Sequence, residues 1–233
     1  MSKLSMTPTV IRFRARRSGP EADLEDAIVP QLHDLFGERT TPNWVGRSIP
    51  VGAGLPDLVS ASHRPELLAA LSLTKSDGYL LAYLRTVSGA RLETILRRTD
   101  KSERAVRKRL GVLAETGAVL ERRGVFRIAS AWRDILLEIV AVEAKISDWR
   151  AAVRQAARNR IFAHRAYVAL PARLAHRVRH EPEFGHRGIG IIGVSNEAEC
   201  TIVRIARHTV PIVWAYYYEL AFVIGDSYGG GPK

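Results

Sequence analysis

The feature that most constrains the fold is the segment 139–146, Ile-Val-Ala-Val-Glu-Ala-Lys-Ile, which is apolar until a carboxylate and an amine appear two residues apart. Such a segment predicts a strand. Because side chains alternate between the two faces of a strand, we expect Glu143 and Lys145 to project to one side while Ala144 points into the sheet behind them. This pair can hold a metal ion and a nucleophilic water together. A solvated strand edge with alternating charges is the alternative interpretation.

The residues after this strand predict an α/β arrangement. Residues 147–165 have the apolar spacing of a helix that carries Gln155, and residues 166–171 form an apolar strand. A strand, a helix and a strand in this order imply parallel neighbours joined by a right-handed crossover. A further strand is expected at 201–206. The helix after Pro211 carries aromatic side chains that favour core packing or, if exposed together, contact with a second copy of the chain.

The residues before the strand supply two more acids. In residues 54–59, Asp57 follows a proline within a short apolar segment. Residues 21–36 have the spacing of an amphipathic helix, with Glu25 in its first half. Pro30 lies inside this helix and is expected to kink or divide it. An exposed helix acid is the alternative interpretation of Glu25.

The order of these elements resembles the PD-(D/E)XK nuclease superfamily. The resemblance makes Pro56-Asp57 and Glu143-x-Lys145 the signature of the site. It implies that Asp57 and Glu143 bind a divalent metal, Mg²⁺ or Mn²⁺, while Lys145 assists the attacking water or stabilises charge. Phosphodiester hydrolysis places negative charge on the attacking and leaving oxygens, which carboxylate-bound cations can stabilise. The implied fold is a restriction-endonuclease-like mixed sheet flanked by helices.

Two further residues match the family pattern. Glu25 corresponds to a helix-borne acid found in many members, and Gln155 to a glutamine that some branches carry in the helix after the E-x-K strand. An aromatic residue four positions further on would strengthen the match, but this chain has Asn159 there, so the subfamily stays open. A plain surface amide is the alternative interpretation of Gln155.

The chain between Asp57 and Glu143 is far longer than two neighbouring strands require, which indicates an inserted domain. Residues 71–129 have the pattern of a winged helix-turn-helix. We expect Thr74 and Asp77 to form a capping box at the start of its first helix. Tyr79, Leu80, Tyr83 and Leu84 are expected to form one apolar stripe on that helix.

Basic residues gather on the third helix and the hairpin of this insert, where a winged helix contacts DNA. The whole chain carries a formal charge of +11 and a pI near 10.3, which favours a nucleic-acid partner, and we expect duplex DNA. A solvated helix face is the alternative interpretation. The predicted DNA contacts are Lys101, Arg104, Arg107, Lys108, Arg122 and Arg123.

The sequence thus predicts an α/β protein in which the nuclease-like core is split by the insert. The predicted divisions are a basic N-terminal arm at 1–20, the first part of the core at 21–70, the winged helix-turn-helix at 71–130, the second part of the core at 131–226 and a flexible tail at 227–233.

Composition narrows the cellular setting. Cys200 is the single cysteine, which excludes an intramolecular disulfide and suits a reducing cytoplasm. No signal-peptide core is present, and the longest apolar run, 210–225, is too short for a membrane span and contains Glu219. We expect a soluble cytoplasmic protein without a membrane partner, associated with the nucleoid if the source is bacterial. The G-x-G-x-x-G letters at 188–193 lie in an apolar strand, so they do not indicate a dinucleotide site.

Two functions follow from these patterns. The first is a Mg²⁺-dependent endodeoxyribonuclease, in which the insert grips duplex DNA while Asp57, Glu143 and Lys145 cut a phosphodiester. The alternative is a DNA-binding transcriptional regulator or sensor that keeps a catalytically inactive nuclease-like core. The retention of all three signature residues favours the enzyme. The target sequence, the choice between DNA and RNA, the biological pathway and a homodimer stay open at this level.

Overall fold

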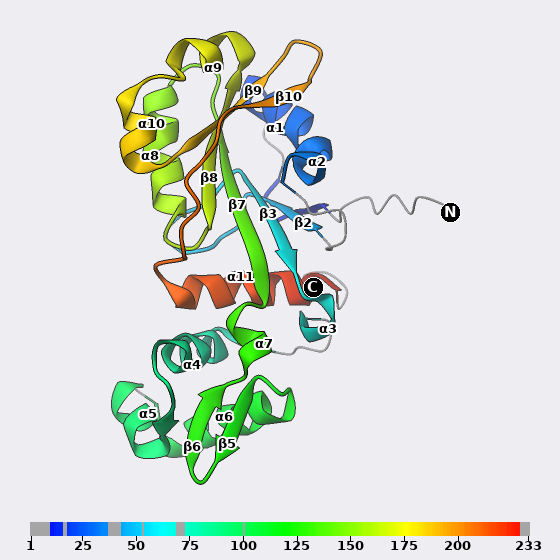
Figure 1. The fold of residues 1–233 in the computed structure, drawn as a ribbon. Helices are drawn as coiled ribbons and strands as arrows, with labels where there is room; N and C mark the ends of the chain where they lie inside the picture. Colours follow the sequence, from blue (N-terminus) through cyan, green and yellow to red (C-terminus); the bar gives the residue numbers. More distant parts are fainter. Residues whose placement is uncertain are drawn as a thin grey trace, which may run out of the picture. The chain divides into compact units, whose positions relative to one another are not determined.

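The computed structural model describes residues 10–15, 18–36, 43–52, 54–68, 73–99 and 101–228. The chain forms two compact units (Figure 1). The sheet unit comprises the described residues up to His63 together with Leu136–Ile212. The helical unit comprises Arg64–Ile135 and the described residues from Val213 onward.

The sheet unit is built on a seven-stranded mixed sheet in the order β1-β2-β3-β7-β8-β9-β10. The pairs β1–β2, β7–β8 and β8–β9 are parallel, and the other three neighbouring pairs are antiparallel. The strands are β1 (Val10–Arg12), β2 (Asn43–Arg47), β3 (Leu58–His63), β7 (Leu136–Ala144), β8 (Arg165–Pro171), β9 (Gly190–Val194) and β10 (Cys200–Arg204).

Helix α8 (Trp149–Asn159) connects β7 to the parallel strand β8, as the sequence predicts. The helix is shorter than the predicted segment 147–165. Asp148 caps its N-terminus, with a side chain that accepts a hydrogen bond from the Ala151 amide at 2.9 Å, and the helix ends before a turn at Arg160. In the middle of its buried face, the side chains of Ala152, Val153 and Ala156 are small and apolar, which lets the helix lie close against the strands.

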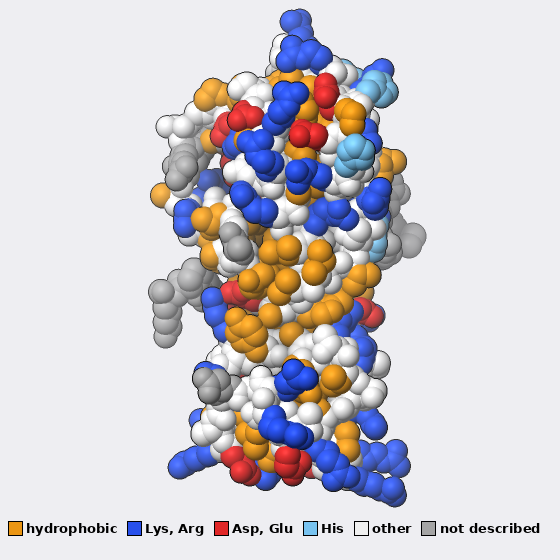
Figure 2. All heavy atoms as spheres, turned by 90° about the vertical axis from the view of Figure 1, so that its left-hand side faces the viewer, with side chains coloured by type: hydrophobic (Ala, Val, Ile, Leu, Met, Phe, Trp, Pro, Cys, Tyr) orange, Lys and Arg blue, Asp and Glu red, His pale blue; other side chains and the backbone are white. Residues whose placement is uncertain are grey.

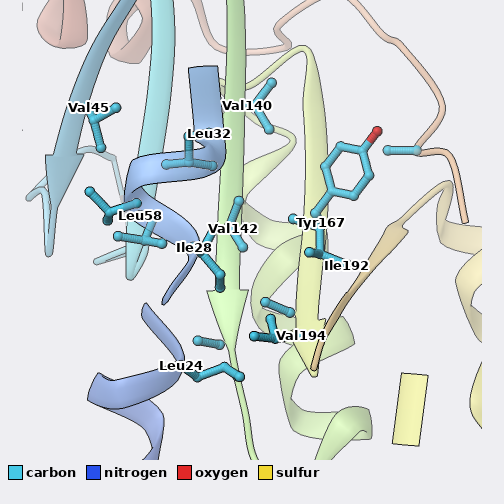
Figure 3. Close-up of a cluster of buried hydrophobic side chains, with 14 residues drawn as sticks. Leu24, Ile28, Leu32, Val45, Leu58, Val140, Val142, Tyr167, Ile192 and Val194 are labelled. Carbon is cyan, nitrogen blue, oxygen red and sulfur yellow. The ribbon is translucent and has the colours of Figure 1, made fainter. Parts of the chain in front are cut away.

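Helices cover both faces of the sheet (Figure 1). One face carries α1 (Pro20–Ile28), η1 (Val29–Gln31) and α2 (Leu32–Phe36), and the other carries α8, α9 (Ala172–Val178) and α10 (Pro182–Arg187). The prediction that Pro30 divides the first helix is confirmed, because the chain tightens into a 3₁₀ turn there. Figure 3 shows Leu24, Ile28 and Leu32 of these helices directed at strand residues such as Val142 and Tyr167.

The predicted arm at 1–20 is partly regular structure. Residues 10–12 form β1, in which Val10 lies opposite Val45 of β2. Arg16 and Arg17 lie outside the described residues, as do residues 229–233 of the predicted tail. Residues 227 and 228 of that tail are the last two of a helix.

The helical unit combines six helices, among the described residues, with a small antiparallel sheet in the order β4-β6-β5. Its helices are α3 (Pro65–Leu68), α4 (Lys75–Thr86), α5 (Leu92–Arg98), α6 (Glu103–Glu115), α7 (Ser130–Arg133) and α11 (Trp214–Tyr228). Its strands are β4 (Ala90–Arg91), β5 (Val119–Arg122) and β6 (Val125–Ile128).

The start of α4 carries the predicted capping box. The Thr74 amide donates to Asp77 Oδ2 at 2.6 Å, and the Asp77 carboxylate, fully buried, also accepts from Arg109 Nε at 2.6 Å. The predicted apolar stripe is wrong at Tyr79, which is 62% exposed. The buried face of α4 runs through Leu80, Leu81 and Leu84 instead.

Helix α11 belongs to the helical unit, whereas the sequence placed residues 131–226 together in the core. It packs against α4 and α3. Within the unit, Tyr218 donates its hydroxyl to the Trp132 carbonyl at 3.0 Å, and the Arg85 guanidinium stacks 3.6 Å over the Trp214 ring. The helix is apolar over much of its circumference, so it needs neighbours on more than one side. None of the helices in the described part of the chain is long and apolar enough to cross a membrane.

Candidate active site

The register of two antiparallel strands brings the predicted acids together. Leu58 of β3 lies opposite Val142 of β7, so Asp57, one residue before β3, comes beside Glu143 near the end of β7. Asp57 Oδ2 accepts a hydrogen bond from the Ala144 amide at 2.9 Å. The two acids are far apart in the sequence and meet at one edge of the sheet.

The Asp57 and Glu143 carboxyl groups lie close enough for each to shift the pKa of the other. Burial, and then the charge of Asp57, raises the pKa of Glu143 to about 8. Burial also raises the pKa of Asp57, although the Ala144 amide and Lys145 favour its charged form. Because two ionised carboxylates in contact repel each other, the pair holds one proton near neutral pH, and Glu143 carries it.

Asn159 completes the surroundings of Glu143. It lies in the last turn of α8, and its Nδ2 donates to Glu143 Oε1 at 2.7 Å. Both side chains are buried, each with 3% of its surface exposed. A buried amide that donates to a carboxyl oxygen fixes the rotamer of that carboxyl group. Asn159, which stands where an aromatic residue would have strengthened the resemblance, therefore lies beside Glu143 in the candidate site.

Lys145 follows the end of β7 and bonds to the same edge. Its Nζ donates to Glu21 Oε2 and to the Ala144 carbonyl, each at 3.0 Å. Burial works against the ammonium form, but the hydrogen bond to Glu21 and the charges of Asp57 and Glu143 outweigh it and raise the pKa of Lys145. The amine is therefore protonated at neutral pH and suits charge stabilisation better than proton abstraction.

Glu25 lies one turn after Glu21 on α1 and faces the same site. Burial, and then the charge of Asp57, raises the pKa of Glu25 to about 7, against the opposing charges of Arg47 and Arg12. The Arg47 guanidinium lies 3.9 Å from Glu25 Oε2 and also bonds to Asp26. Glu25 therefore lines the same cavity as Asp57 and feels its charge.

Asp57, Lys145 and Glu25 line a cavity of about 580 Å³. Gln155 of α8 lines it, and its Oε1 is buried without a hydrogen-bond partner in the described part of the chain. Arg12 and Arg14, from the predicted basic arm, line it as well. Its acidic and amine lining residues are Asp57, Glu21, Glu25 and Lys145. The cavity is therefore lined both by carboxylates and by cations that can attract phosphate.

The donor set suits a hard divalent cation. No group of three or more His, Cys, Asp or Glu residues placed to hold a metal occurs among the residues described. Asp57 and Glu143 nevertheless provide two carboxylates in contact, and the shared proton marks a position where positive charge is favourable. Mg²⁺ commonly takes one or two protein carboxylates and fills its remaining positions with water and phosphate oxygens. The residues present therefore fit Mg²⁺ or Mn²⁺ with few protein ligands.

Two residues of the site, Asn159 and Glu21, were not among the predicted site residues. Asn159 continues the apolar series Trp149, Ala152, Val153 and Ala156 on the buried face of α8, and a polar residue in such a series is a signal that it has a partner. Glu21 is four residues before Glu25, so the two share a helix face. The sequence pattern alone does not show which strand end that face meets.

In the helical unit, the six predicted DNA contacts are all exposed. Ser102 caps the N-terminus of α6, which carries three of them, and Arg107 is paired with Glu103 at 2.7 Å. Arg122 ends β5, and Arg123 and Gly124 form the hairpin turn with φ of 53° and 74°. Figure 2 shows Lys and Arg side chains projecting from the lower end of this unit.

Comparisons with protein-family models, with curated proteins and with solved structures found no match to this chain.

Proposed function

We propose that this protein is a metal-dependent nuclease that hydrolyses phosphodiester bonds in DNA. The observation that carries the proposal is the convergence of Asp57, Glu143 and Lys145 at one edge of the sheet. In the sequence, residues 64–135 of the helical unit separate Asp57 from the other two. A lone E-x-K triplet is common on strands. A second acid beside such a triplet, in a buried setting, is much less common.

The fold supports the same proposal. A mixed sheet with helices on both faces agrees with the restriction-endonuclease-like fold that the resemblance implies. Helices α4, α5 and α6 followed by the β5–β6 hairpin agree with a winged helix-turn-helix placed between β3 and β7. In this proposal α6 is the recognition helix and the hairpin is the wing.

Each residue of the site has a distinct role in the proposed reaction. Asp57 and Glu143 would hold the divalent ion, which would supply charge stabilisation for the attacking and leaving oxygens. Asn159 orients Glu143 by its hydrogen bond. Lys145, protonated, stabilises negative charge on the scissile phosphate once it is released from Glu21. Arg12 and Arg14 attract the DNA backbone into the cavity.

The direct test is cleavage of supercoiled and linear duplex DNA with Mg²⁺ or Mn²⁺. We expect cleavage by the wild type and none by Glu143→Ala or Lys145→Ala, while both variants still bind duplex in EDTA. Glu197→Ala, an exposed acid in the turn after β9, is the matched control and should cleave as the wild type does. Absence of cleavage by the wild type with either metal contradicts the nuclease proposal.

Duplex binding by the helical unit is tested separately. We expect Arg104→Ala/Arg107→Ala to weaken duplex binding and to reduce the salt slope of affinity by about 2, because each lost phosphate contact removes about one released counterion. Arg173→Ala/Arg177→Ala on the exposed side of α9 is the charge-matched control. Equal weakening in both variants indicates a general charge effect and contradicts a specific role for α6.

One observation favours the DNA-binding regulator as the second candidate. Lys145 is engaged by Glu21, and Glu143 by Asn159 and Asp57, so the signature groups satisfy one another within the chain. A site that has lost catalytic activity can persist as a structural network of this kind. Duplex binding that depends on α6, together with no cleavage under any condition, would assign the protein to this class.

A further inference from the structure

The exposed aromatic Tyr79 lines a groove in the helical unit. Its side chain projects from α4 with 62% of its surface exposed, although the helical spacing had predicted burial. The groove has a volume of about 580 Å³ and is formed by α4, the end of α5 and α6. Its apolar lining residues besides Tyr79 are Leu80, Ala105 and Val106.

The charged residues that line this groove are all cations. Two of them have internal partners, because Arg109 bonds to Asp77 and Lys75 bonds to Glu219 at 2.7 Å. The other three are Arg98, Lys101 and Lys108. Within the described part of the chain these three make no ion pair, and all are exposed. The groove therefore presents uncompensated positive charge around an apolar floor.

We propose that this groove binds single-stranded DNA, with an unpaired base stacked on Tyr79 and the adjoining phosphates held by Arg98, Lys101 and Lys108. A cationic groove with an exposed aromatic ring is the combination that single-strand binding uses, because every base has a π-face and every nucleotide a phosphate. A duplex hides the faces of its bases inside the stack, so contact with the Tyr79 ring selects an unpaired nucleotide.

The proposal deepens the proposed DNA binding by the helical unit and does not depend on cleavage. It gives Lys101 and Lys108 a second partner, because both were expected to contact duplex. A substrate with a junction between duplex and single strand would place its paired part on the wing arginines and its unpaired part in the groove. Flapped, branched or frayed DNA is the substrate class that satisfies both surfaces.

The test measures affinity by fluorescence anisotropy in EDTA, with a labelled oligothymidylate and, separately, a labelled blunt duplex. We expect Tyr79→Ala to weaken oligothymidylate binding about 5- to 150-fold, the range for loss of one stacked base, and to leave duplex binding unchanged. Tyr79→Phe, which keeps the ring, should bind as the wild type does. Leu120→Ala, which truncates another exposed apolar side chain of the unit, is the matched control.

A photocrosslink gives the position independently. Oligothymidylate that carries 5-iodouracil should crosslink to Tyr79 in the wild type, and the crosslinked peptide is identified by mass spectrometry. Full oligothymidylate affinity in Tyr79→Ala, or equal weakening of both DNAs, overturns the proposal. If the wild type binds duplex but not oligothymidylate, this inference fails while the proposed function stands. If it binds neither, the proposed DNA binding fails as well.

Discussion

At the residue scale, the shared proton of Asp57 and Glu143 makes the stability of the sheet unit depend on pH. Glu143 has an ordinary pKa of 4.5 and a folded-state pKa of about 8. A carboxyl group whose pKa is raised by folding stabilises the protein fully below the ordinary value, and that contribution is lost as pH rises through the folded value. Glu25, with a folded pKa of about 7, acts in the same direction.

We therefore expect the free energy of unfolding in EDTA to fall between about pH 5 and about pH 9, and Glu143→Gln to fall less, because the amide imitates the protonated acid. Urea unfolding of both proteins measures the difference, which cancels the effect of other titrating groups. Mg²⁺ should restore part of the wild-type stability at the higher pH and none in Glu143→Gln. Parallel pH curves for the two proteins would contradict the shared proton.

Asn159 provides a second prediction at this scale. Asn159→Ala leaves Glu143 Oε1 without its donor, and loss of a partner that orients a metal ligand typically costs about 10- to 100-fold in metal affinity or activity. Cleavage rates over a Mg²⁺ titration should show a higher Mg²⁺ requirement, with a folded circular dichroism spectrum. Asn159→Ser, which keeps a donor at a shorter reach, should be intermediate. A purely structural role would lower stability and leave the Mg²⁺ requirement unchanged.

At the element scale, close packing explains the glycines of the run 188–193. Gly190 of β9 has no room for a side chain, because an added Cβ would meet the Tyr167 ring and lie 2.7 Å from the Ala206 amide nitrogen. Gly188, with φ of 67°, ends α10 in the left-handed region. Close packing thus requires Gly190 and backbone conformation favours Gly188, so these two glycines of the G-x-G-x-x-G pattern have structural causes.

We expect Gly190→Ala to destabilise the protein by about 1–3 kcal/mol through overpacking. Gly111→Ala is the matched comparison, because its added Cβ meets nothing within 4 Å on α6, and alanine in a helix interior should stabilise by about 0.5–1 kcal/mol. Denaturant unfolding measures both changes. A neutral Gly190→Ala would show that the Tyr167 ring moves aside at little cost.

Local sequence patterns predict the helices and strands of this chain better than they predict which residues these elements contact. The capping box of Thr74, the break at Pro30 and the parallel crossover after β7 each depend on neighbouring residues, and all three are confirmed. The burial of Tyr79 was predicted from helical spacing and is wrong, because the spacing does not say how wide the covered face is. Asn159 and Glu21 enter the site through tertiary packing that spacing does not encode.

At the scale of the whole molecule, the helical unit is assembled from two separate stretches of chain. Residues 64–135 supply most of it, and α11 returns after the last strand of the sheet unit. In α4, Leu81 and Leu84 are fully buried, and Gly78 would meet the Phe222 ring of α11 at 3.3 Å if it carried a Cβ. The apolar face of α4 therefore requires a helix that lies far away in sequence.

Truncation after Ile212 tests this dependence. We expect the helical unit to lose cooperative unfolding and to become sensitive to protease, because burial of large side chains such as Tyr218 and Leu220 is lost. Hydrogen exchange of α4 and α6 measures the effect. Ile212→Ser, which alters a 73% exposed side chain and keeps α11, should leave that exchange unchanged. Retained protection of α4 in the truncated chain would contradict the assignment.

The return of α11 also sets an order of events on the ribosome. Every strand of the sheet unit precedes α11 in the chain, so the residues of the carboxylate site are synthesised before the helical unit is complete. Because α11 completes the helical unit, we expect residues 64–135 alone not to fold as an independent unit. A graft of this unit into another protein must bring α11 along, joined by a new linker, or cover the bare side of α4 with newly chosen polar residues.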